Sequence, residues 1–226
     1  MKRKLKRYFF IIFFVSVLFG EAIYQYKLYA AQRLPLDGKV VIIDPGHGGW
    51  DPGKTGMYGD DEKNINLVIA HNLKFLLEMG GAQAVMTRYE DTATDKNKTA
   101  DLKKRISLSD ATEADIMISI HQNSFTSPIA KGAQVFYYRK SEKGRRLAEC
   151  IQNAITEKAD KENTRTAKEN ENYYLLKNTS VPSVIGECGF LSNRAEEEKL
   201  NSSEYQQMMA WSIYSGVVEY FSADEQ

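Results

Sequence analysis

The sequence predicts a single α/β domain with a mixed, mostly parallel central sheet and helices on both faces. Apolar runs of strand length, rich in β-branched residues, alternate along the chain with segments whose apolar residues repeat at helical spacing. Three of the apolar runs end at residues of ligand or acid/base type, which is typical of sites at the carboxyl ends of strands in open α/β sheets. The 226 residues contain no internal repeat and suffice for one domain with a sizeable core.

The N-terminal 31 residues differ from the rest of the chain. A basic stretch, MKRKLKR, precedes an apolar run of 13 residues at positions 8–20. A membrane-spanning helix needs about 20 apolar residues, so this run is typical of a signal peptide, although residues 22–24 could extend it into a marginal anchor. Residues 30–31 (Ala-Ala) make only a poor cleavage site. We therefore expect export with an uncleaved anchor. Residues 1–31 are then the signal or anchor segment and linker, and residues 32–226 are the translocated domain.

The first elements of the body are predicted in order from turn signals and periodicity. A linker over residues 21–37 ends in the turn signal Pro-Leu-Asp-Gly, and residues 39–44 (KVVIID) are typical of a buried strand. A glycine-rich loop then leads to a helix that begins at about Asp61 and ends at the Gly-Gly pair 80–81. The apolar residues of this helix repeat at helical spacing: Ile65, Val68, Ile69, Leu73, Leu76 and Leu77.

The middle of the chain continues the alternation of strands and helices. Residues 82–88 form a predicted strand, and a polar, lysine-rich loop follows at 89–100. A helix is expected over 102–111. Two further strands are predicted at 114–121 and 132–139, because both segments are short, apolar and rich in residues that favour strands.

The last third is predicted as helix, loop, strand and helix. Residues 141–159 are amphipathic, residues 156–172 are charge-rich and expected as a solvated loop, and residues 173–178 could form a strand or a short helix. A strand is expected at 182–188 and a final helix at 197–221. The expected core contacts of these two helices are Leu147, Ile151 and Ile155, and then Met208, Trp211, Ile213, Val217, Val218 and Tyr220.

Charge and cysteine content exclude several classes of protein. The chain has 30 basic and 30 acidic residues, so its net charge gives no reason to expect a nucleic-acid partner. Cys150 and Cys188 are the only two cysteines. We expect two buried thiols, because a domain of this size needs no disulfide. We do not expect Cys188 to be a nucleophile, because no histidine lies near it in sequence to activate it.

Two histidines follow predicted strands and are candidate ligands. His47 lies in DPGHGG, where glycines allow a sharp bend and close approach of a metal or substrate. His121 ends the run IMISIH. Either residue by itself could be structural, His47 as a turn histidine and His121 as a hydrogen-bonded core histidine. The third histidine, His71, lies within a predicted helix with no ligand-type neighbour at helical spacing, and we exclude it from the site.

Two carboxylates complete the candidate site. Glu187 follows the apolar run SVIG, and a carboxyl in apolar surroundings has a raised pKa, which suits a general acid/base. A structural ion pair of Glu187 with Arg165 or Lys168 is the alternative. Glu62 opens the first long helix of the body, where an acid also favours the helix dipole. From the residues alone, Asp60 and Asp61 compete with Glu62 for a ligand role. Two imidazoles and two carboxylates are the components of a catalytic zinc site with a spare acid/base.

Ordered motifs from about residue 39 to 221 resemble one family of enzymes. They are VVIIDPGHGGWDPGKTG, the Glu62–Lys63 pair, the arginine of MTR, RISLSD, SIHQNS, GAQVFYY and VPSVIGECGFLSN. They look like those of the zinc-dependent N-acetylmuramoyl-L-alanine amidases (the amidase_3 family). The resemblance implies that His47, Glu62 and His121 hold Zn²⁺ and that Glu187 is the catalytic acid/base. It also implies peptidoglycan as the substrate, with Asn123 and Arg165 as candidate substrate contacts.

Two positions depart from the family pattern. Gln122 stands where a small residue is common, and Thr166 replaces a glycine in the segment TRTAK. Both departures bear on substrate contacts rather than on ligands.

The resemblance also implies a biological setting. It is greatest to the sporulation and germination amidases that prepare spore cortex for muramic-δ-lactam formation, and with no wall-binding repeats in the chain, a recruiting or activating partner is expected. A zinc peptidase acting on stem peptides and a non-catalytic wall-binding module are the alternatives.

Overall fold

The computed structural model describes residues 2–32 and 34–223. The chain divides into two compact units, Met1–Pro35 and Leu36–Gln226, and each is described by itself. The first unit contains one helix, α1 (Lys2–Gln32). This helix continues through residues 21–32, where a linker was expected, because no glycine or proline interrupts the chain between Gly20 and Gln32. Among the described residues, no helix meets the length and hydropathy needed to cross a membrane.

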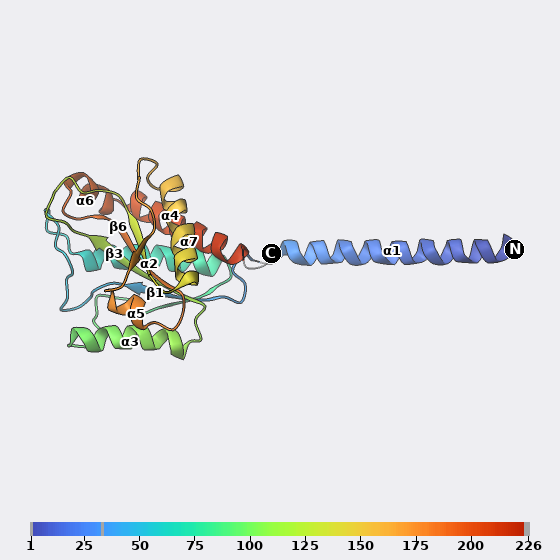
Figure 1. Ribbon diagram of the computed structural model, residues 1–226, viewed down its shortest axis with the longest axis horizontal. Coiled ribbons are helices and arrows are strands. Elements are labelled where there is room, and N and C mark those ends of the chain that lie inside the picture. Colours follow the sequence, from blue (N-terminus) through green and yellow to red (C-terminus); the bar gives the residue numbers. More distant parts are fainter. Residues whose placement is uncertain (1, 33, 224–226) are drawn as a thin grey trace. The chain divides into compact units, whose positions relative to one another are not determined.

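The second unit contains a six-stranded sheet in the order β2-β1-β3-β6-β4-β5 (Figure 1). All neighbouring strands are parallel except β4 and β6, which are antiparallel. This confirms the mixed, mostly parallel sheet that the alternation predicted. The strands are β1 (Val40–Pro45), β2 (Gln83–Met86), β3 (Ile116–Asn123), β4 (Gln134–Tyr138), β5 (Lys168–Asn170) and β6 (Ser183–Phe190).

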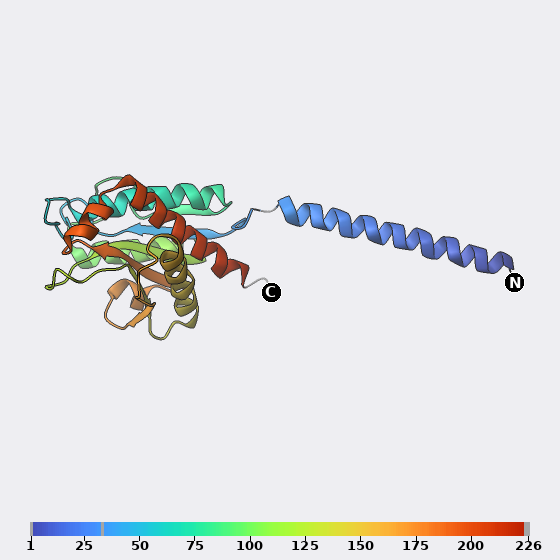
Figure 2. The ribbon, with the colours of Figure 1, turned by 90° about the horizontal axis from the view of Figure 1, so that it is seen from above.

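Helices cover both faces of the sheet, as predicted. One core cluster joins α2, α4 and α7 to residues such as Val41 and Ile43, and a second joins α3 and α5 to Ile42. The alternation of these three β1 residues between clusters follows the two-residue period of a strand. Figure 1 shows α3 and α5 together on one side, and α2 lies beside α7 (Figure 2). The helices are α2 (Glu62–Met79), α3 (Lys98–Ala111), α4 (Glu142–Lys158), α5 (Tyr174–Asn178), α6 (Arg194–Leu200) and α7 (Ser203–Ser222).

Several boundaries differ from the sequence-based prediction because of local capping and pairing. The helix α3 begins at Lys98 instead of residue 102, because the Asn97 side chain accepts hydrogen bonds from the N–H groups of Thr99 and Ala100. The single final helix is split into α6 and α7, since Ser202 caps a new helix. The expected loop at 156–172 contains β5, whose pairing with β4 was not visible in its polar sequence. Residues 174–178 are helical, which decides between the two alternatives for that segment.

The exposed side of α7 corrects two expected core contacts. Met208 is 39% exposed and Trp211 46% exposed, so neither anchors the helix. The helix packs through Ile213 and Val217, as predicted, and through Met209; these three residues repeat every four positions and are buried. Val68 of α2 is likewise exposed. Both cysteines are free thiols, but Cys150 is half-buried while Cys188 is buried.

Candidate active site

The four candidate residues meet at the carboxyl edge of the three central strands. Strand β3 lies between β1 and β6, all parallel, and His121 pairs in register with Glu187. His47 lies two residues beyond the end of β1. Glu62 is the first residue of α2, which follows the glycine-rich loop. The sheet topology therefore brings together side chains that are as much as 140 residues apart.

The loop that carries His47 has an unusual backbone. His47 has a φ of 61°, a left-handed conformation that costs free energy for a residue with a Cβ. Its carbonyl accepts a hydrogen bond from Arg105 (2.8 Å), and Arg88 donates to the carbonyls of Pro45 (2.9 Å) and Gly46 (3.0 Å). Two buried guanidinium groups thus hold this strained loop. A Cβ at Gly46 would lie 2.3 Å from Nε2 of His121, so the close packing of loop and ring requires glycine there.

The imidazole of His47 is oriented by a carboxylate on its far side. Oδ2 of Asp51 lies 2.9 Å from Nδ1, and Nε2 lies 3.3 Å from Oε2 of Glu62. A carboxylate behind a ligand histidine fixes the ring and the tautomer. Burial tends to raise the pKa of Asp51, but the neighbouring imidazole of His47 outweighs burial and lowers it. Asp51 was not among the predicted site residues, although its position four residues after His47 in GHGGWD was a usable signal.

Glu62 is the central carboxylate of the group. It is 3% exposed, and its oxygens accept the backbone N–H groups of Lys54 (2.9 Å) and Gln122 (3.0 Å). Oε1 also lies 2.9 Å from Nδ1 of His121. Burial tends to raise the pKa of Glu62, but the hydrogen bonds with His121 and His47 hold it far below its ordinary value. The carboxylate is therefore ionised, as a metal ligand must be.

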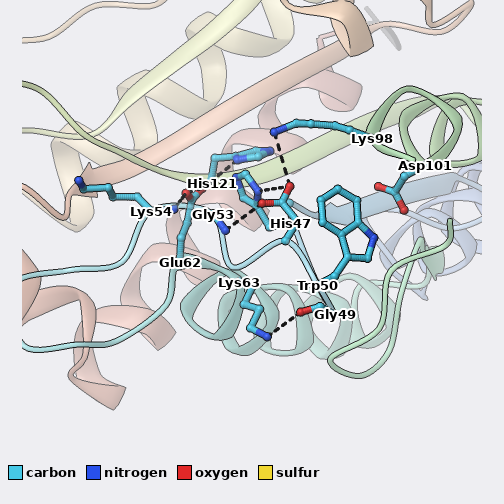
Figure 3. A network of polar contacts seen from close by, with 12 residues as sticks. His47, Gly49, Trp50, Gly53, Lys54, Glu62, Lys63, Lys98, Asp101 and His121 are labelled. Carbon is cyan, nitrogen blue, oxygen red and sulfur yellow. Dashed lines mark hydrogen bonds and ion pairs between the residues drawn. The ribbon is translucent and has the colours of Figure 1, made fainter. Parts of the chain in front are cut away.

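His47, Glu62 and His121 form a metal-capable group. One ligand atom from each residue lies within 4.8 Å of the others. Figure 3 shows the three side chains pointing toward one another. Burial disfavours a charge on His121, but its hydrogen bond to Glu62 outweighs burial and raises the pKa of His121 to about 9. Because a metal binds the neutral imidazole, metal binding would displace this proton.

Glu187 lies in the same cavity as Glu62, but its pKa is shifted in the opposite direction. It is 8% exposed, and burial raises the pKa of its carboxyl despite the nearby imidazoles. Oε1 lies 3.4 Å from the hydroxyl of Tyr173, and Oε2 has no hydrogen-bond partner among the residues that the structure describes. This is the raised pKa that the apolar neighbourhood suggested. Oε2 of Glu187, which has no partner among the described residues, can accept a proton.

The cavity around these residues has a volume of about 360 Å³. Asn123, Lys54 and Lys98 line it. The ammonium group of Lys98 lies 3.5 Å from Oδ2 of Asp51 (Figure 3). Apolar wall residues come from α3, α5 and β6: Leu102, Leu175 and Ile185. The cavity thus presents basic, apolar and metal-capable surfaces to one ligand.

Arg165 is placed differently from the other candidates. Its guanidinium donates to Oε1 of Gln134 (3.0 Å) and to the carbonyl of Lys131 (2.7 Å), and it lies over the ring of Phe190. The Arg165 guanidinium is therefore engaged by these groups and is not the counter-ion of Glu187.

The two departures from the family pattern also have defined places. Gln122 is buried, and its side-chain amide donates to Oδ1 of Asn66 (3.0 Å), next to Glu62. Asn66 in turn donates to the carbonyl of Gly46 (3.1 Å). Gln122 therefore both lines the cavity and contacts Asn66, which lies next to Glu62. Thr166 contributes its backbone carbonyl, which accepts from Gln134.

The fold and this group of side chains define an α/β enzyme with a metal-capable His–Glu–His site and a buried carboxyl, that of Glu187, beside it. The chain belongs to the N-acetylmuramoyl-L-alanine amidase family, Amidase_3, whose sequence pattern matches residues 41–219. It is a hydrolase of cell-wall peptidoglycan.

Individual relatives agree with this assignment. The chain is 36% identical to the germination-specific N-acetylmuramoyl-L-alanine amidase of Bacillus subtilis, over 98% of this chain and 97% of the relative. The fold matches the CwlD amidase of Clostridioides difficile, solved in complex with the GerS lipoprotein, with a TM-score of 0.79, 37% identity and coverage of 83% of this chain and 100% of the other. It also matches the amidase AmiC2 of Nostoc punctiforme, with a TM-score of 0.75, 34% identity and coverage of 82% and 99%.

Proposed function

We propose that the chain is a zinc-dependent amidase that hydrolyses the bond between the lactyl group of N-acetylmuramic acid and L-alanine in spore cortex. The observation that carries the proposal is the convergence of His47, Glu62 and His121 beside the buried Glu187 in one cavity. Two imidazole nitrogens and one carboxylate oxygen are a common ligand set of catalytic zinc, which keeps one position open. When bound, zinc would polarise the scissile carbonyl and lower the pKa of a water molecule.

The protein's own residues carry the proton steps. Glu187 accepts a proton on Oε2 as the water oxygen bonds to the carbonyl carbon, and returns it to the nitrogen of L-alanine as the carbon–nitrogen bond breaks. This transfer gives a lactyl carboxylic acid and the α-amine of L-alanine. The acid proton then passes to the amine, so the final products are a lactyl carboxylate and an ammonium group, and the protons balance. The raised pKa of Glu187 suits this role, because the same group must bind and then release a proton near neutral pH.

Digestion of purified peptidoglycan tests the reaction. We expect glycan strands free of peptide, and stem peptides that begin with a free L-alanine, both identified by mass spectrometry. Cleavage between amino acids of the stem would instead make the protein a zinc peptidase. Zinc binding without any cleavage would make it a binding module.

The N-terminal unit supports a location outside the cytoplasm. Helix α1 exposes the large apolar side chains Phe10, Phe13 and Phe14, each more than half exposed, and basic residues precede them in sequence. An apolar helix with a basic flank associates with membranes and directs the following chain outward. We infer export and N-terminal membrane association. The GerS lipoprotein bound to the C. difficile amidase suggests that this chain also has a protein partner at the membrane.

Complementation in a spore-forming host tests the cortex role and the N-terminal unit together. Spores that lack the amidase should lack muramic-δ-lactam, and the full chain should restore it. A chain that starts at residue 32 should fail to restore it, although it retains the catalytic unit. Normal lactam in the deleted strain would contradict the cortex role, and full rescue by the short chain would contradict the need for export.

A further inference from the structure

Tyr173 contacts the proposed acid/base but was not suggested by any sequence pattern. It directly precedes α5 and lines the active-site cavity. Its hydroxyl lies 3.4 Å from Oε1 of Glu187. The residue is held in place on two sides: its backbone N–H donates to Oδ1 of Asn170 (2.9 Å), and its ring packs edge-to-face on Phe136, with centroids 5.6 Å apart. The phenol is therefore a fixed group that faces a movable carboxylate.

The two oxygens of Glu187 have different surroundings. Oε1 faces the Tyr173 hydroxyl, while Oε2 is buried and has no partner among the described residues. Rotation of a carboxylate about its last side-chain bond is nearly free unless a contact selects one orientation. The Tyr173 contact is the one hydrogen bond to a side-chain oxygen of Glu187 in the described part of the chain. At 3.4 Å, the distance from the Tyr173 hydroxyl to Oε1 is near the upper limit for a hydrogen bond. Catalytic hydrogen bonds often shorten when substrate binds.

We propose that Tyr173 is a positioning residue: its O–H group donates to Oε1 of Glu187 and holds the carboxylate so that Oε2 faces the reacting water. The inference rests on the acid/base role proposed for Glu187. A neutral donor suits this place, because a lysine or arginine there would stabilise the charged carboxylate and make it a weaker base. Burial and the neighbouring Glu187 raise the pKa of Tyr173, so the phenol keeps its proton.

The variant Tyr173→Phe in the full chain tests the proposal, because it removes the hydroxyl and keeps the ring on Phe136. We expect kcat to fall by roughly 10- to 100-fold, the range for a hydrogen bond to a charged group. KM should change less than about twofold, and zinc content should equal that of the unmodified chain. Tyr138→Phe is the matched control, since Tyr138 packs on the same core cluster from β4 and should leave kcat unchanged.

A double-mutant comparison separates positioning from direct contact with substrate. In a Glu187→Gln background, Tyr173→Phe should reduce the residual turnover less than about twofold, because the base it orients is gone. An unchanged kcat in Tyr173→Phe, or an effect on KM alone, would overturn the proposal. So would an equal loss in both backgrounds, which would make Tyr173 a substrate contact. Native turnover in Glu187→Gln would instead refute the proposed role of Glu187 itself, independently of Tyr173.

Discussion

Glu187→Gln is expected to lower kcat for release of stem peptides by roughly 10³-fold while zinc content stays unchanged, since general acid–base catalysis contributes about 10²- to 10⁴-fold. Glutamine has nearly the same shape as glutamate, so it can still accept a hydrogen bond from Tyr173. It cannot take a proton from water, because its amide nitrogen is not basic. Glu187 is not one of the three residues whose ligand atoms converge, so its replacement leaves that group intact.

This prediction needs turnover and metal content measured on the same preparation. Free L-alanine amino groups report the rate, and elemental analysis reports zinc. Glu157→Gln is the control, because Glu157 is exposed and paired only with Lys158 in the described part of the chain. A folded Glu187→Gln protein with native kcat would remove Glu187 from the mechanism.

The variant His47→Ala is expected to lose both zinc and turnover, with kcat reduced by at least about 10³-fold. It removes one of the three converging ligand atoms, and the remaining Glu62 and His121 cannot complete the set that holds catalytic zinc. The zinc stoichiometry should fall close to zero after dialysis. Circular dichroism should remain native, because His47 lies in a loop beyond β1 and not in the core.

The third histidine provides the control for this experiment. His71 is exposed on α2, with Nε2 2.9 Å from the carbonyl of Tyr89. His71→Ala should retain zinc and turnover. Zinc at native stoichiometry in His47→Ala would show that the metal is held elsewhere. Together with Glu187→Gln, the pair separates loss of the metal from loss of the base.

The sequence was a good guide to the fold because hydrophobic periodicity is a local property. The β-branched runs of β1, β3 and β6 and the helical spacing in α2 and α4 need no knowledge of distant contacts. What periodicity did not show is β5, a three-residue polar strand that exists only because β4 is beside it. It also misjudged the face of α7, because Trp211 and Met208 are apolar yet point away from the sheet side.

The acidic run Asp60–Asp61–Glu62 shows why the ligand could not be chosen from residue type. Asp61 is the N-cap residue of α2 with an extended backbone, whereas Glu62 is the first helical residue, so their side chains leave the chain in different directions. Asp61 accepts a hydrogen bond from the Thr55 hydroxyl (2.8 Å) at the surface, and Glu62 is directed into the site. Motif resemblance selected Glu62, and the start of α2 supplies the physical reason.

By itself, the sequence determined an α/β domain with polar residues at the ends of its apolar runs, because strand and helix periods are set by neighbours along the chain. Only the tertiary structure decided which of those residues share a cavity. The parallel register of β3 and β6 places His121 opposite Glu187, and the loop after β1 places His47 beside His121. The segment that leads into α5 brings Tyr173 to the Glu187 carboxylate. Such contacts depend on sheet order and helix docking, which join residues far apart in the chain.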